Sequence, residues 1–447
     1  MKKAIHNTPI YDFIGIGAGP FNLGLAALSA PIEELNCLFF DKAARFDWHP
    51  GMMIEGTTLQ VPFMADLVSL ADPTSPYSFL NYIKKMGRIY SFYIRENFLL
   101  LRKEYNHYCQ WVIEQLENVH FKSDVEQIYY KESEGLYHVS VFNQELEQTQ
   151  VYKTKKLVMG TGTRPYLPKC CLRLNKEVIH SAHYLQHKAN LQQKKSITLV
   201  GSGQSAAEIF YDLLQDIDNH DYSLNWLTRS GRFFPLEYTK LTLEMTSPEY
   251  VDYFYNLPTQ KRESIINKQK NLYKGINGDL INAIHDLLYT KRLENPNLPV
   301  SLQTNVTLKE ANFDPRQSYF DLTFHQHEQD QRFAHQTEGL VLATGYHYQV
   351  PACLNPIVHR IKWNQQQRFD VHRNYSIDHQ HSEIFVQNAE LHTHGFVTPD
   401  LGMGAYRNSY ILREITGQMH YPIEEQIAFQ QFGVPQRHAL ATLKHEL

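Results

Sequence analysis

The residues best placed to do chemistry lie near the start of the chain, where residues 11–30 read YDFIGIGAGPFNLGLAALSA. A β-rich run meets Gly17 and Gly19 there, and an alanine-rich helical pattern follows. The spacing Gly17-x-Gly19-x-x-Asn22 matches the dinucleotide-binding fingerprint, except that asparagine replaces the third glycine, which normally permits close packing of helix on strand. The next β-rich run ends at Asp41, at about the distance where an acidic side chain accepts the ribose hydroxyls of an adenine dinucleotide. These residues predict a first nucleotide site.

A second copy of this pattern begins near residue 196, where the chain reads SITLVGSGQSAAEIFYDLL. It places Gly201-x-Gly203-x-x-Ala206 between a strand and a helix. The following β-rich run ends in Arg229 rather than in an acid, and arginine suits the 2′-phosphate of NADPH better than the free 2′-hydroxyl of NADH. One glycine loop can be an ordinary strand-to-helix turn, but two copies with suitable following strands predict two nucleotide sites.

Two α/β domains are needed to position these loops. Further β-rich runs at 157–168 and 339–351 bracket the second loop. A chain that completes one nucleotide domain, inserts another and then returns to the first has this pattern. We therefore expect a discontinuous first domain of residues 1–165 and 336–447, and a second domain of residues 166–335.

A third region is indicated by residues 235–300, which are aromatic-rich and mostly helical in pattern and belong to neither fingerprint. These residues either cap the active site or pack as plain helical core, and the pattern leaves both readings open. The expected fold is α/β, with two Rossmann-like dinucleotide-binding domains and a small, mostly helical substrate domain.

Composition excludes several classes of protein. The chain has 447 residues, of which 43% are hydrophobic, and a formal charge of −4, so it is a globular protein of two or three domains and not a dedicated nucleic-acid binder. We expect no membrane span, because no apolar run approaches the ~18 residues required. The opening MKKAIHNTP is too polar for a signal peptide, so we expect a cytoplasmic protein.

Cysteine and histidine spacing predicts neither disulfides nor a metal site. The five cysteines lack C-x-x-C spacing, and none of the histidine clusters is H-x-x-x-H on a helix with a nearby acid. A domain for NADPH facing a second nucleotide domain implies hydride transfer to a flavin, with FAD as the first cofactor. A disulfide reductase of this architecture needs a redox cysteine pair near the flavin, whereas Cys170 and Cys171 are adjacent and follow the first domain. Oxygen chemistry is the remaining choice.

Several longer motifs carry a family resemblance. They are GIGAGPFNL, DWHPGM at 47–52, LQVPFMADLVSLADPTSPYSFLNY at 59–82, GSGQSAAE, TSPEYVDYF, LATGY and HTHGFVTPDLGMGAYR at 392–407. Together they resemble the N-hydroxylating flavoprotein monooxygenases of siderophore biosynthesis, the family of lysine and ornithine N-monooxygenases. The resemblance covers nearly the whole chain.

This resemblance implies a reaction in three stages. NADPH reduces FAD, O₂ adds to give a C4a-hydroperoxyflavin, and the terminal amine of the substrate attacks the distal oxygen to form a hydroxylamine. No protein side chain acts as the nucleophile. A closed, dry site protects the oxygen adduct and also lowers the pKa of the amine from ~10.4, which supplies the neutral nucleophile. The resemblance also implies a homo-oligomer, by analogy a tetramer.

The site residues follow from the resemblance, position by position. The FAD contacts fall on Gly17, Gly19, Pro20, Asn22, Asp41, Trp48, His49, Gln60, Val125, Pro399, Asp400 and Leu401. The NADPH contacts fall on Gly201, Gly203, Gln204, Ser205, Ala206, Arg229, Lys274 and Gly275.

The substrate positions depart from the amino-acid hydroxylases of this family. Their F-L-K-D-L segment has a lysine that pairs with the substrate α-carboxylate, and here that position is Ala65. Two more substrate-facing polar positions fall on Leu243 and Gly402. A buried carboxylate left without its cation costs ~3–5 kcal/mol, so an α-amino acid should bind poorly. We therefore expect an aliphatic diamine, namely putrescine, cadaverine or 1,3-diaminopropane.

Some residue roles stay open at this stage. The distal ammonium of a diamine needs a partner, and Glu244, Asp400 and Glu390 are candidates by position. Lys240 is an alternative cation that would keep L-lysine or L-ornithine as the substrate. Asp66, in the FMADLV segment, has no assigned chemistry and is equally suited to capping a helix.

Two other classes of protein are less well supported. Baeyer–Villiger and sulfur-oxidising flavin monooxygenases carry F-x-G-x-x-x-H-x-x-x-[WY] before the second loop. The stretch LNKEVIHSAHY keeps His180 and Tyr184 but has Leu174 and Lys176 at the Phe and Gly positions. A non-catalytic nucleotide-binding protein would not oxidise NADPH.

Overall fold

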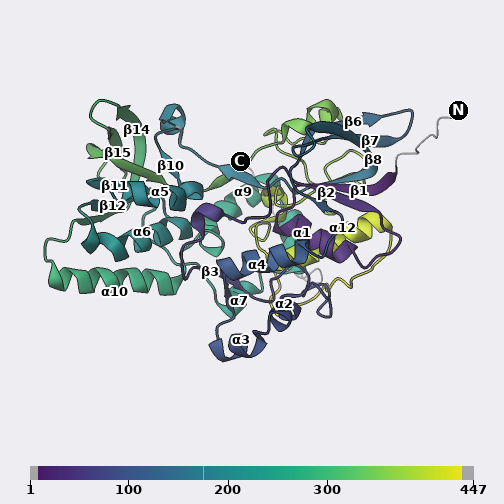
Figure 1. Cartoon of the computed structure of the whole chain (residues 1–447), viewed down its shortest axis with the longest axis horizontal. Coiled ribbons are helices and arrows are strands. Elements are labelled where there is room, and N and C mark those ends of the chain that lie inside the picture. The colour runs from purple at the N-terminus through teal and green to yellow at the C-terminus, as the bar shows by residue number, and fades with distance from the viewer. Residues whose placement is uncertain (1–8, 175, 435–447) are drawn as a thin grey trace.

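The computed structural model describes residues 9–174 and 176–434, and Figure 1 shows two α/β units side by side with short helices at their junction. The unit with α1 and α12 lies at the right of that view, and the unit with α6 and α10 lies at the left. Residues 1–8, which contain most of the polar N-terminal stretch, lie outside the described residues. Within the described ranges, no helix has both the length and the apolar character needed to cross a membrane.

The first unit is built on a 7-stranded sheet of order β5-β2-β1-β8-β7-β6, with β19 beside β8. The middle of β1 is apolar without alternation, and Phe13 and Ile14 are fully buried, because both faces of these parallel strands are covered. The strands are β1 (Ile10–Ile16), β2 (Cys37–Phe40), β5 (Val119–His120), β6 (Ser123–Lys131), β7 (Leu136–Asn143), β8 (Gln148–Met159) and β19 (Ile384–Val386); the helices are α1 (Pro20–Ser29), α4 (Arg102–Ile113), α12 (Gly402–Thr416) and η6 (Ala352–Arg360).

The second unit has a 5-stranded parallel sheet of order β10-β17-β11-β12-β13. Helices pack on one face, and a three-stranded antiparallel sheet packs on the other, so this sheet is also covered on both sides. Its elements are β10 (Ile179–His180), α5 (Tyr184–Leu191), β11 (Ser196–Val200), α6 (Gln204–Asp216), η4 (Ile217–Asn219), β12 (Ser223–Leu227), α10 (Gly278–Glu294), β13 (Val300–Gln303) and β17 (Gly339–Leu342), with β14 (Val306–Asp314), β15 (Tyr319–Gln326) and β16 (Gln331–Thr337) in the small sheet.

The two chain crossings between the units pair with each other. β9 (Thr163–Pro165) leaves the first unit and β18 (Tyr346–Tyr348) returns to it, and the two form an antiparallel ribbon. The return lies later than the expected boundary at 335, because β17 pairs with β10 and β11 inside the second sheet. The β-rich run at 339–351 therefore belongs first to the second unit and then to the crossing.

The helical region is smaller than the expected segment of residues 235–300. It comprises α7 (Lys240–Leu243), α8 (Pro248–Tyr255), α9 (Thr259–Lys268) and η5 (Lys270–Leu272), and α8 and α9 pack against α11 (Leu391–His394). α10 instead packs on α6 and places Ile284 in the core of the second unit. The helical pattern alone could not separate these two destinations, because both bury an apolar face.

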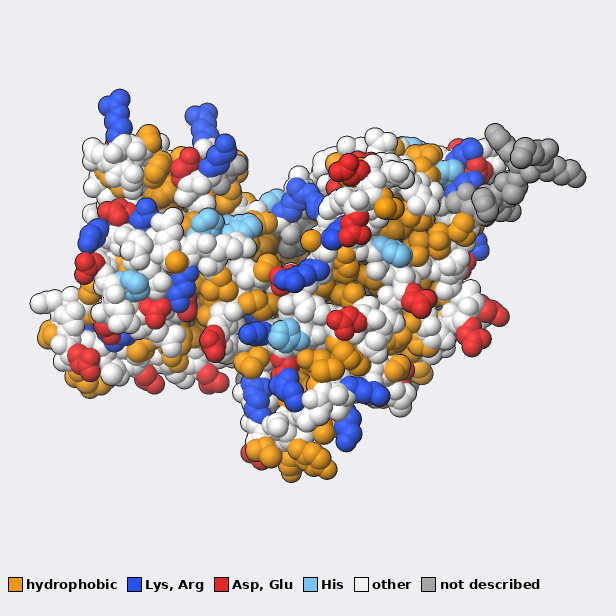
Figure 2. Space-filling model, viewed as in Figure 1, with side chains coloured by type: hydrophobic (Ala, Val, Ile, Leu, Met, Phe, Trp, Pro, Cys, Tyr) orange, Lys and Arg blue, Asp and Glu red, His pale blue; other side chains and the backbone are white. Residues whose placement is uncertain are grey.

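A projection made by α3 (Ile89–Arg95) carries apolar side chains into solvent. Figure 2 shows hydrophobic side chains gathered at this tip, at the bottom of the view. Tyr90, Tyr93, Ile94 and Phe98 are between 65% and 77% exposed. The remaining short elements are η1 (Pro50–Met52), β3 (Thr58–Pro62), α2 (Phe79–Lys85), β4 (Leu99–Leu101), η2 (Lys169–Leu174) and η3 (Ser181–His183).

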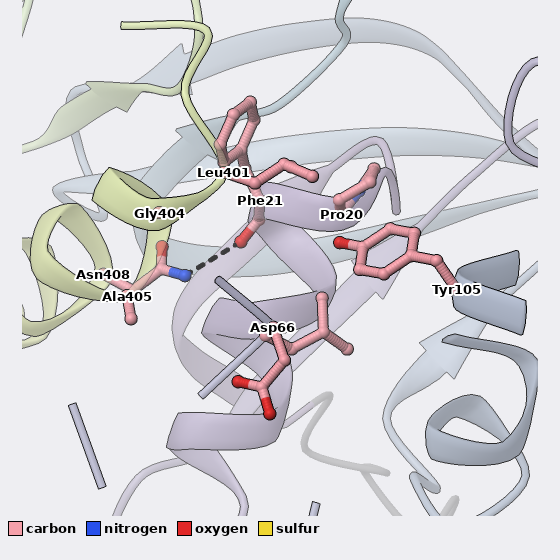
Figure 3. Close-up of a pocket in the computed structure, with 9 residues that line it drawn as sticks. Pro20, Phe21, Asp66, Tyr105, Leu401, Gly404, Ala405 and Asn408 are labelled. Atoms are coloured by element: carbon pink, nitrogen blue, oxygen red, sulfur yellow. Dashed lines mark hydrogen bonds between the residues drawn. The ribbon is translucent and has the colours of Figure 1, made fainter. Parts of the chain in front are cut away.

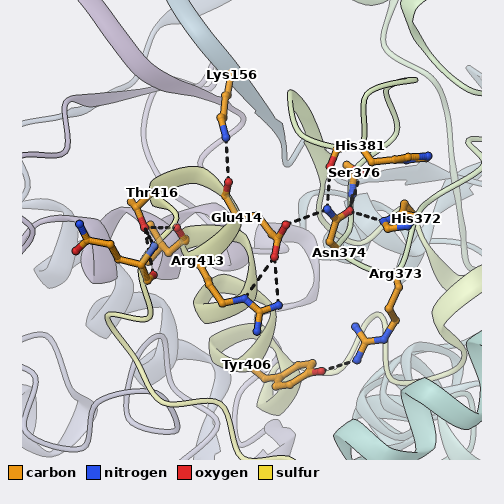
Figure 4. Close-up of polar contacts among 12 residues, drawn as sticks. Lys156, His372, Arg373, Asn374, Ser376, His381, Tyr406, Arg413, Glu414 and Thr416 are labelled. Carbon is orange, nitrogen blue, oxygen red and sulfur yellow. Dashed lines mark hydrogen bonds and ion pairs between the residues drawn. The ribbon is translucent and has the colours of Figure 1, made fainter.

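A polar network holds α12 in place between the first sheet and the small helices (Figure 4). Lys156 of β8 donates to the backbone carbonyl of Glu414 at 2.9 Å, and Asn374 donates to the Glu414 carboxylate at 3.1 Å. Arg373 donates to the Tyr406 hydroxyl at 2.7 Å and to Asp252 of α8 at 2.6 Å. The Glu414 contacts hold the C-terminal end of α12 against β8, and Arg373 ties its N-terminal half to α8.

Candidate functional site

A cavity of about 1600 Å³ lies between the two units and is lined by both glycine loops and by residues of α7 and α9. A pocket for one small molecule usually measures ~300–1,000 Å³. The volume therefore leaves room for two nucleotides and a substrate in a single connected space.

The first glycine loop requires glycine at position 17 and leaves open space at position 19. Gly17 has a φ of +88°, and a Cβ there would lie 2.4 Å from the carbonyl oxygen of Gly160. Gly19 is the N-cap of α1, and a Cβ there would meet no atom within 4 Å. Pro20 follows at the first helical turn. This is a helix N-terminus with free space in front of it, which fits a pyrophosphate.

Asn22 explains how this loop works without its third glycine. Its side chain is 1% exposed and donates to the Gly17 carbonyl at 2.7 Å, while Gln387 donates to its Oδ1 at 2.7 Å. The space that the missing glycine would provide comes from Gly160, where a Cβ would lie 2.5 Å from the Asn22 amide. The fingerprint is therefore completed by a glycine that directly follows a different strand, β8.

Asp41 lies at the end of β2 and lines the cavity. One carboxylate oxygen accepts the backbone N–H of Ala18 at 2.8 Å, and the other accepts that of Ala43 at 2.8 Å. Each oxygen keeps a second lone pair, so Asp41 can tie the loop in place and still accept a ribose hydroxyl.

The residues expected beside the flavin gather in one part of the wall. Trp48, His49, Gln60, Pro399 and Leu401 all line the cavity. The lack of surrounding water, together with the nearby Arg102 guanidinium, lowers the pKa of His49 to about 4, so its imidazole is neutral at physiological pH. Val125 does not line the cavity: its side chain is 9% exposed and packs in the core of the first unit. Its expected contact with FAD is not supported by its side-chain position.

The second glycine loop has the same construction. Gly201 has a φ of +157°, and a Cβ there would lie 2.3 Å from the Ala343 carbonyl oxygen. Gly203 is the N-cap of α6, and Gln204 and Ser205 line the cavity. Ala206 is fully buried in the core and does not reach the cavity, so its side chain contributes packing and not a nucleotide contact.

Cations without acidic partners lie near this second loop. Arg229 and Lys274 line the cavity, and neither forms an ion pair among the described residues. Burial, together with the positive charges of Lys270 and Arg229, lowers the pKa of Lys274. Such a cluster fits a phosphate, which agrees with the 2′-phosphate of NADPH. Gly275 lets the chain approach the backbone of Leu236, where a Cβ would be 2.3 Å from nitrogen.

Two of the three altered substrate positions lie together beside Asp400. A Cβ built on Gly402 would be 3.7 Å from the Ala65 Cβ and 3.1 Å from Oδ1 of Asp400. Leu243 of α7 lines the cavity separately. Where the amino-acid hydroxylases are expected to have a lysine, this chain has the buried methyl group of Ala65. Neither Ala65 nor Gly402 lines the cavity, whereas Asp400 does.

Asp400 is the one candidate for the distal ammonium that faces the cavity without a committed partner among the described residues. Its Oδ1 accepts the backbone N–H of Gly402 at 2.7 Å, and no ion pair involves it within the described ranges. Burial raises the pKa of this carboxyl, while the Gly402 hydrogen bond and Arg407 act in the opposite direction. Tyr238 lines the cavity nearby, and burial and Asp400 raise the pKa of its hydroxyl.

The other two acidic candidates are occupied elsewhere. Glu390 is fully buried and pairs with Arg407 at 2.6 Å, and neither side chain is more than 2% exposed. Glu244 does not line the cavity; its carboxylate accepts the backbone N–H of Gln430 at 3.1 Å. Both carboxylates therefore have structural roles.

Asp66 also has a structural role, and it is the helix cap that the sequence allowed. Its carboxylate accepts the backbone N–H of Val68 and Ser69 at 2.9 and 2.6 Å, and that of Phe79, the first residue of α2, at 2.7 Å. Figure 3 shows it on the wall of a small pocket that also includes Phe21, whose carbonyl accepts a hydrogen bond from Asn408. Asp66 thus caps α2 from a distance.

Sequence reasoning missed several residues that line the cavity, namely Phe21, Arg102, Gly160, Tyr238, Glu263 and His392. Gly160 had a usable signal, because it ends a β-rich run in a chain whose first fingerprint lacks a glycine. Phe21 and His392 lie inside the motifs GIGAGPFNL and HTHGFVTPDLGMGAYR, which gave neither residue a role of its own. Arg102, Tyr238 and Glu263 stand in none of the quoted motifs, and only the folded chain brings them to the cavity. Among the described residues no group of three or more His, Cys, Asp and Glu side chains could hold a metal ion.

Two nucleotide loops facing one cavity define a two-nucleotide oxidoreductase, in which NADPH serves a bound flavin. The chain belongs to the L-lysine 6-monooxygenase/L-ornithine 5-monooxygenase family, whose model matches residues 9–348. It is 54% identical over 432 residues to a putrescine N-hydroxylase of Shewanella oneidensis, covering 97% of this chain and 86% of that protein. It is 53% identical over 439 residues to an alcaligin biosynthesis enzyme of Bordetella pertussis, covering 98% and 94%.

A solved structure extends this similarity to the fold. The FAD-bound cadaverine monooxygenase of the desferrioxamine pathway of Erwinia amylovora matches with a TM-score of 0.94 at 57% identity, over 96% of this chain and 99% of that one. The expected family and the expected α/β fold with Rossmann-like sheets are confirmed.

Proposed function

We propose that this chain is an FAD- and NADPH-dependent monooxygenase that hydroxylates one terminal amine of an aliphatic diamine. The reaction consumes R–NH₂, O₂, NADPH and H⁺ and yields R–NH–OH, NADP⁺ and H₂O. The three relatives described above, among them a putrescine N-hydroxylase and a cadaverine monooxygenase, support this substrate class. The product would supply the hydroxylamine of a hydroxamate siderophore.

The observation that carries the proposal is that the expected lysine position holds Ala65 and that the nearby Asp400 carboxylate lines the cavity. Ala65 and Gly402 leave no positive charge there, and the neighbouring carboxylate of Asp400 faces the cavity. An ammonium group gains from this carboxylate, whereas the α-carboxylate of an amino acid would meet a like charge and no counterion. Lys240 does not supply that counterion, because it is exposed and does not line the cavity.

The protein residues bind and orient the reactants. When bound, FAD would accept electrons from NADPH and pass them to O₂, so that oxygen is delivered to the amine. The loop at Gly17 and Gly19 would hold the FAD pyrophosphate, and the loop at Gly203 with Arg229 would hold NADPH. Asp400 would bind the distal ammonium and so orient the opposite amine toward the flavin.

The reacting amine must be neutral, and the cavity wall favours that form. Leu243 and Leu401 place hydrocarbon at the wall, and a site with little water lowers the pKa of an alkylamine from its usual ~10.4. Asp400 keeps the other end charged, since a carboxylate stabilises a nearby ammonium. One diamine thus presents a neutral nucleophile at one end and a cation at the other.

The position of His180 does not support the alternative function, Baeyer–Villiger or sulfur oxidation, for which this histidine was part of the expected motif. Nδ1 of His180 accepts the backbone N–H of Ala182 at 3.1 Å, and Nε2 lies 3.1 Å from the Gly345 carbonyl oxygen. His180 does not line the cavity. We assign it a structural role at the crossing between the units.

We include three further points in the proposal. The two units correspond to an FAD domain and an NADPH domain. The enzyme acts in the cytoplasm, because it uses NADPH and all five cysteines are free thiols. It forms a homo-oligomer, by analogy a tetramer, and the exposed apolar tip of α3 is a surface suited to self-association. Analytical ultracentrifugation at two protein concentrations tests the last point, and a monomer at both would contradict it.

The proposed function is tested by measuring hydroxylamine, not only NADPH consumption, since NADPH oxidation can be uncoupled from hydroxylation. FAD-loaded protein is supplied with O₂ and with NADPH or NADH, in the presence of 1,3-diaminopropane, putrescine or cadaverine. We expect N-hydroxydiamine with NADPH and much less with NADH. NADPH oxidation that yields only H₂O₂ with every diamine would refute the proposal.

A further inference from the structure

A short segment of the first unit is embedded in the second. η1 carries Gly51 and Met52, from the WHPGM motif, and a Cβ on Gly51 would lie only 2.0 Å from the carbonyl oxygen of Ala182 in η3. Met52 is 2% exposed and packs in the core of the second unit with Phe210 and Ile197. The two units are therefore in direct backbone contact at this motif, and glycine is required for it.

A buried ion pair crosses between the units at the same place. Arg102, the first residue of α4, donates from Nη1 and Nη2 to the two oxygens of Glu208 in α6, at 2.8 and 2.6 Å. The side chains are 13% and 2% exposed. Arg102 also donates to the Met52 carbonyl at 3.2 Å, so one guanidinium contacts both η1 and α6. Two parallel charge-assisted hydrogen bonds fix an orientation as well as a distance.

Glu208 also accepts a hydrogen bond from the second glycine loop, where NADPH is expected to bind. Gln204 donates to Glu208 Oε1 at 2.8 Å and accepts the backbone N–H of Asn277 at 2.8 Å. Gln204 is the first residue of α6, directly after Gly203, and its side chain lines the cavity. Glu208 itself does not line the cavity. A continuous chain of polar contacts thus joins α4 of the first unit to the phosphate loop of the second.

We propose that Glu208 is a positioning residue that, through Arg102 and Gln204, holds the NADPH loop at a fixed place opposite the flavin site. This inference rests on the proposed use of FAD and NADPH, but not on the identity of the amine. A hydride moves from NADPH to FAD with two electrons, leaving NADP⁺ and reduced flavin. The transfer requires close approach of the two rings, and a displacement of ~1 Å can cost ~100-fold in rate.

The test compares Glu208→Gln with a matched control on the same helix. Asp212, four residues further along α6, accepts hydrogen bonds from Tyr184 at 2.5 Å and Lys188 at 3.0 Å within the second unit. The measurement is the limiting rate of flavin reduction by saturating NADPH without O₂. We expect Glu208→Gln to lower this rate about 10-fold or more, and Asp212→Asn to leave it unchanged. Reoxidation by O₂ of chemically reduced enzyme without NADP⁺ should be unaffected in both.

Three outcomes overturn the inference. They are a wild-type reduction rate in Glu208→Gln, an equal loss in both variants, and slowed reoxidation in Glu208→Gln alone, which would place the defect at the FAD site. If Glu208→Gln does not fold, Glu208→Asp keeps the charge on a shorter side chain and should still reduce flavin more slowly than wild type; a wild-type rate would contradict the proposal. Flavin reduction needs no amine, so a failed diamine assay leaves this test intact.

Discussion

At the scale of single residues, the main question is which carboxylates do chemistry. Glu390 and Asp66 are buried, and their partners are protein groups that hold the fold together. Asp400 differs, because it lines the cavity and, among the described residues, its carboxylate accepts only one hydrogen bond, from the backbone N–H of Gly402. Position in sequence could not separate these three acids, since Asp66 and Asp400 lie within motifs of the family resemblance and Glu390 lies two residues before one.

Replacing Asp400 by asparagine should weaken diamine binding without removing the flavin chemistry. The variant loses a charge-assisted hydrogen bond to the distal ammonium, worth ~1.5–3 kcal/mol, so KM for putrescine should rise roughly 10- to 100-fold. Steady-state hydroxylamine formation gives KM and kcat separately. The matched control is Glu244→Gln, whose carboxylate binds Gln430, and its KM should not change. An unchanged KM in Asp400→Asn would remove this residue from the substrate site.

At the scale of elements, the two glycine loops could be predicted from the sequence. The role of Gly160, which makes room for Asn22 in the first loop, could not. A strand, a tight turn and a helix follow from local sequence, because Gly17 needs a positive φ and the helix starts at Pro20. That Gly160 makes room for Asn22 depends on the parallel pairing of β1 with β8, more than a hundred residues apart. Contacts of this range are not encoded in local periodicity.

Gly160→Ala should therefore disturb FAD binding. Its Cβ would lie 2.5 Å from the Asn22 side chain, which hydrogen bonds to the Gly17 carbonyl and from Gln387 hold in place. We expect about a 10-fold increase in the FAD dissociation constant, measured by fluorescence titration of the apoprotein. The double variant Asn22→Gly/Gly160→Ala restores the space and should recover part of the affinity. Wild-type affinity in the single variant would disprove the steric argument.

His180 should make stability depend on pH. Burial lowers its pKa to about 4 in the folded protein, against 6.5 when unfolded, so below pH 6.5 the unfolded state binds the proton more readily. This histidine should thus cost up to about 3 kcal/mol of the free energy of unfolding as the pH falls from 6.5 to 4. In urea unfolding between pH 4 and 8, the free energy of unfolding of His180→Gln should therefore fall less steeply with decreasing pH than that of the wild type.

The control for this experiment is a histidine on the surface. His285 of α10 has a side chain that is 79% exposed, so His285→Gln should keep the wild-type pH dependence. Equal slopes for His180→Gln and wild type would show that His180 is not held neutral by the fold.

At the scale of the whole molecule, the order of the units was predictable but their contact was not. Two fingerprints and the runs that bracket the second one indicate an inserted domain. The packing of η1 on η3 and the burial of Met52 in the other unit have no local signature, because an apolar residue after a glycine suits many environments. Local pattern was likewise unable to show that α10 packs on α6, and so the sequence placed its residues in the substrate region.

Gly51→Ala should separate the two units locally. The added Cβ would lie 2.0 Å from a backbone oxygen, which cannot rotate away as a flexible side chain can. We expect a lower melting temperature and slower flavin reduction by NADPH. Gly278→Ala is the control, because a Cβ there meets nothing within 4 Å, and it should match or exceed wild-type stability. A Gly51→Ala protein with wild-type stability and reduction rate would contradict close docking at this motif.

The central claim is that the site accepts a diamine and rejects an amino acid, and one matched pair of substrates tests it most directly. L-Ornithine is putrescine with an α-carboxylate, so the ratio of kcat/KM for hydroxylamine formation isolates that group. A carboxylate without a counterion costs ~3–5 kcal/mol, which predicts a preference for putrescine of at least about 100-fold. Equal values, or a preference for ornithine, would show that another residue binds the carboxylate and that the assignment of Ala65, Gly402 and Asp400 is wrong.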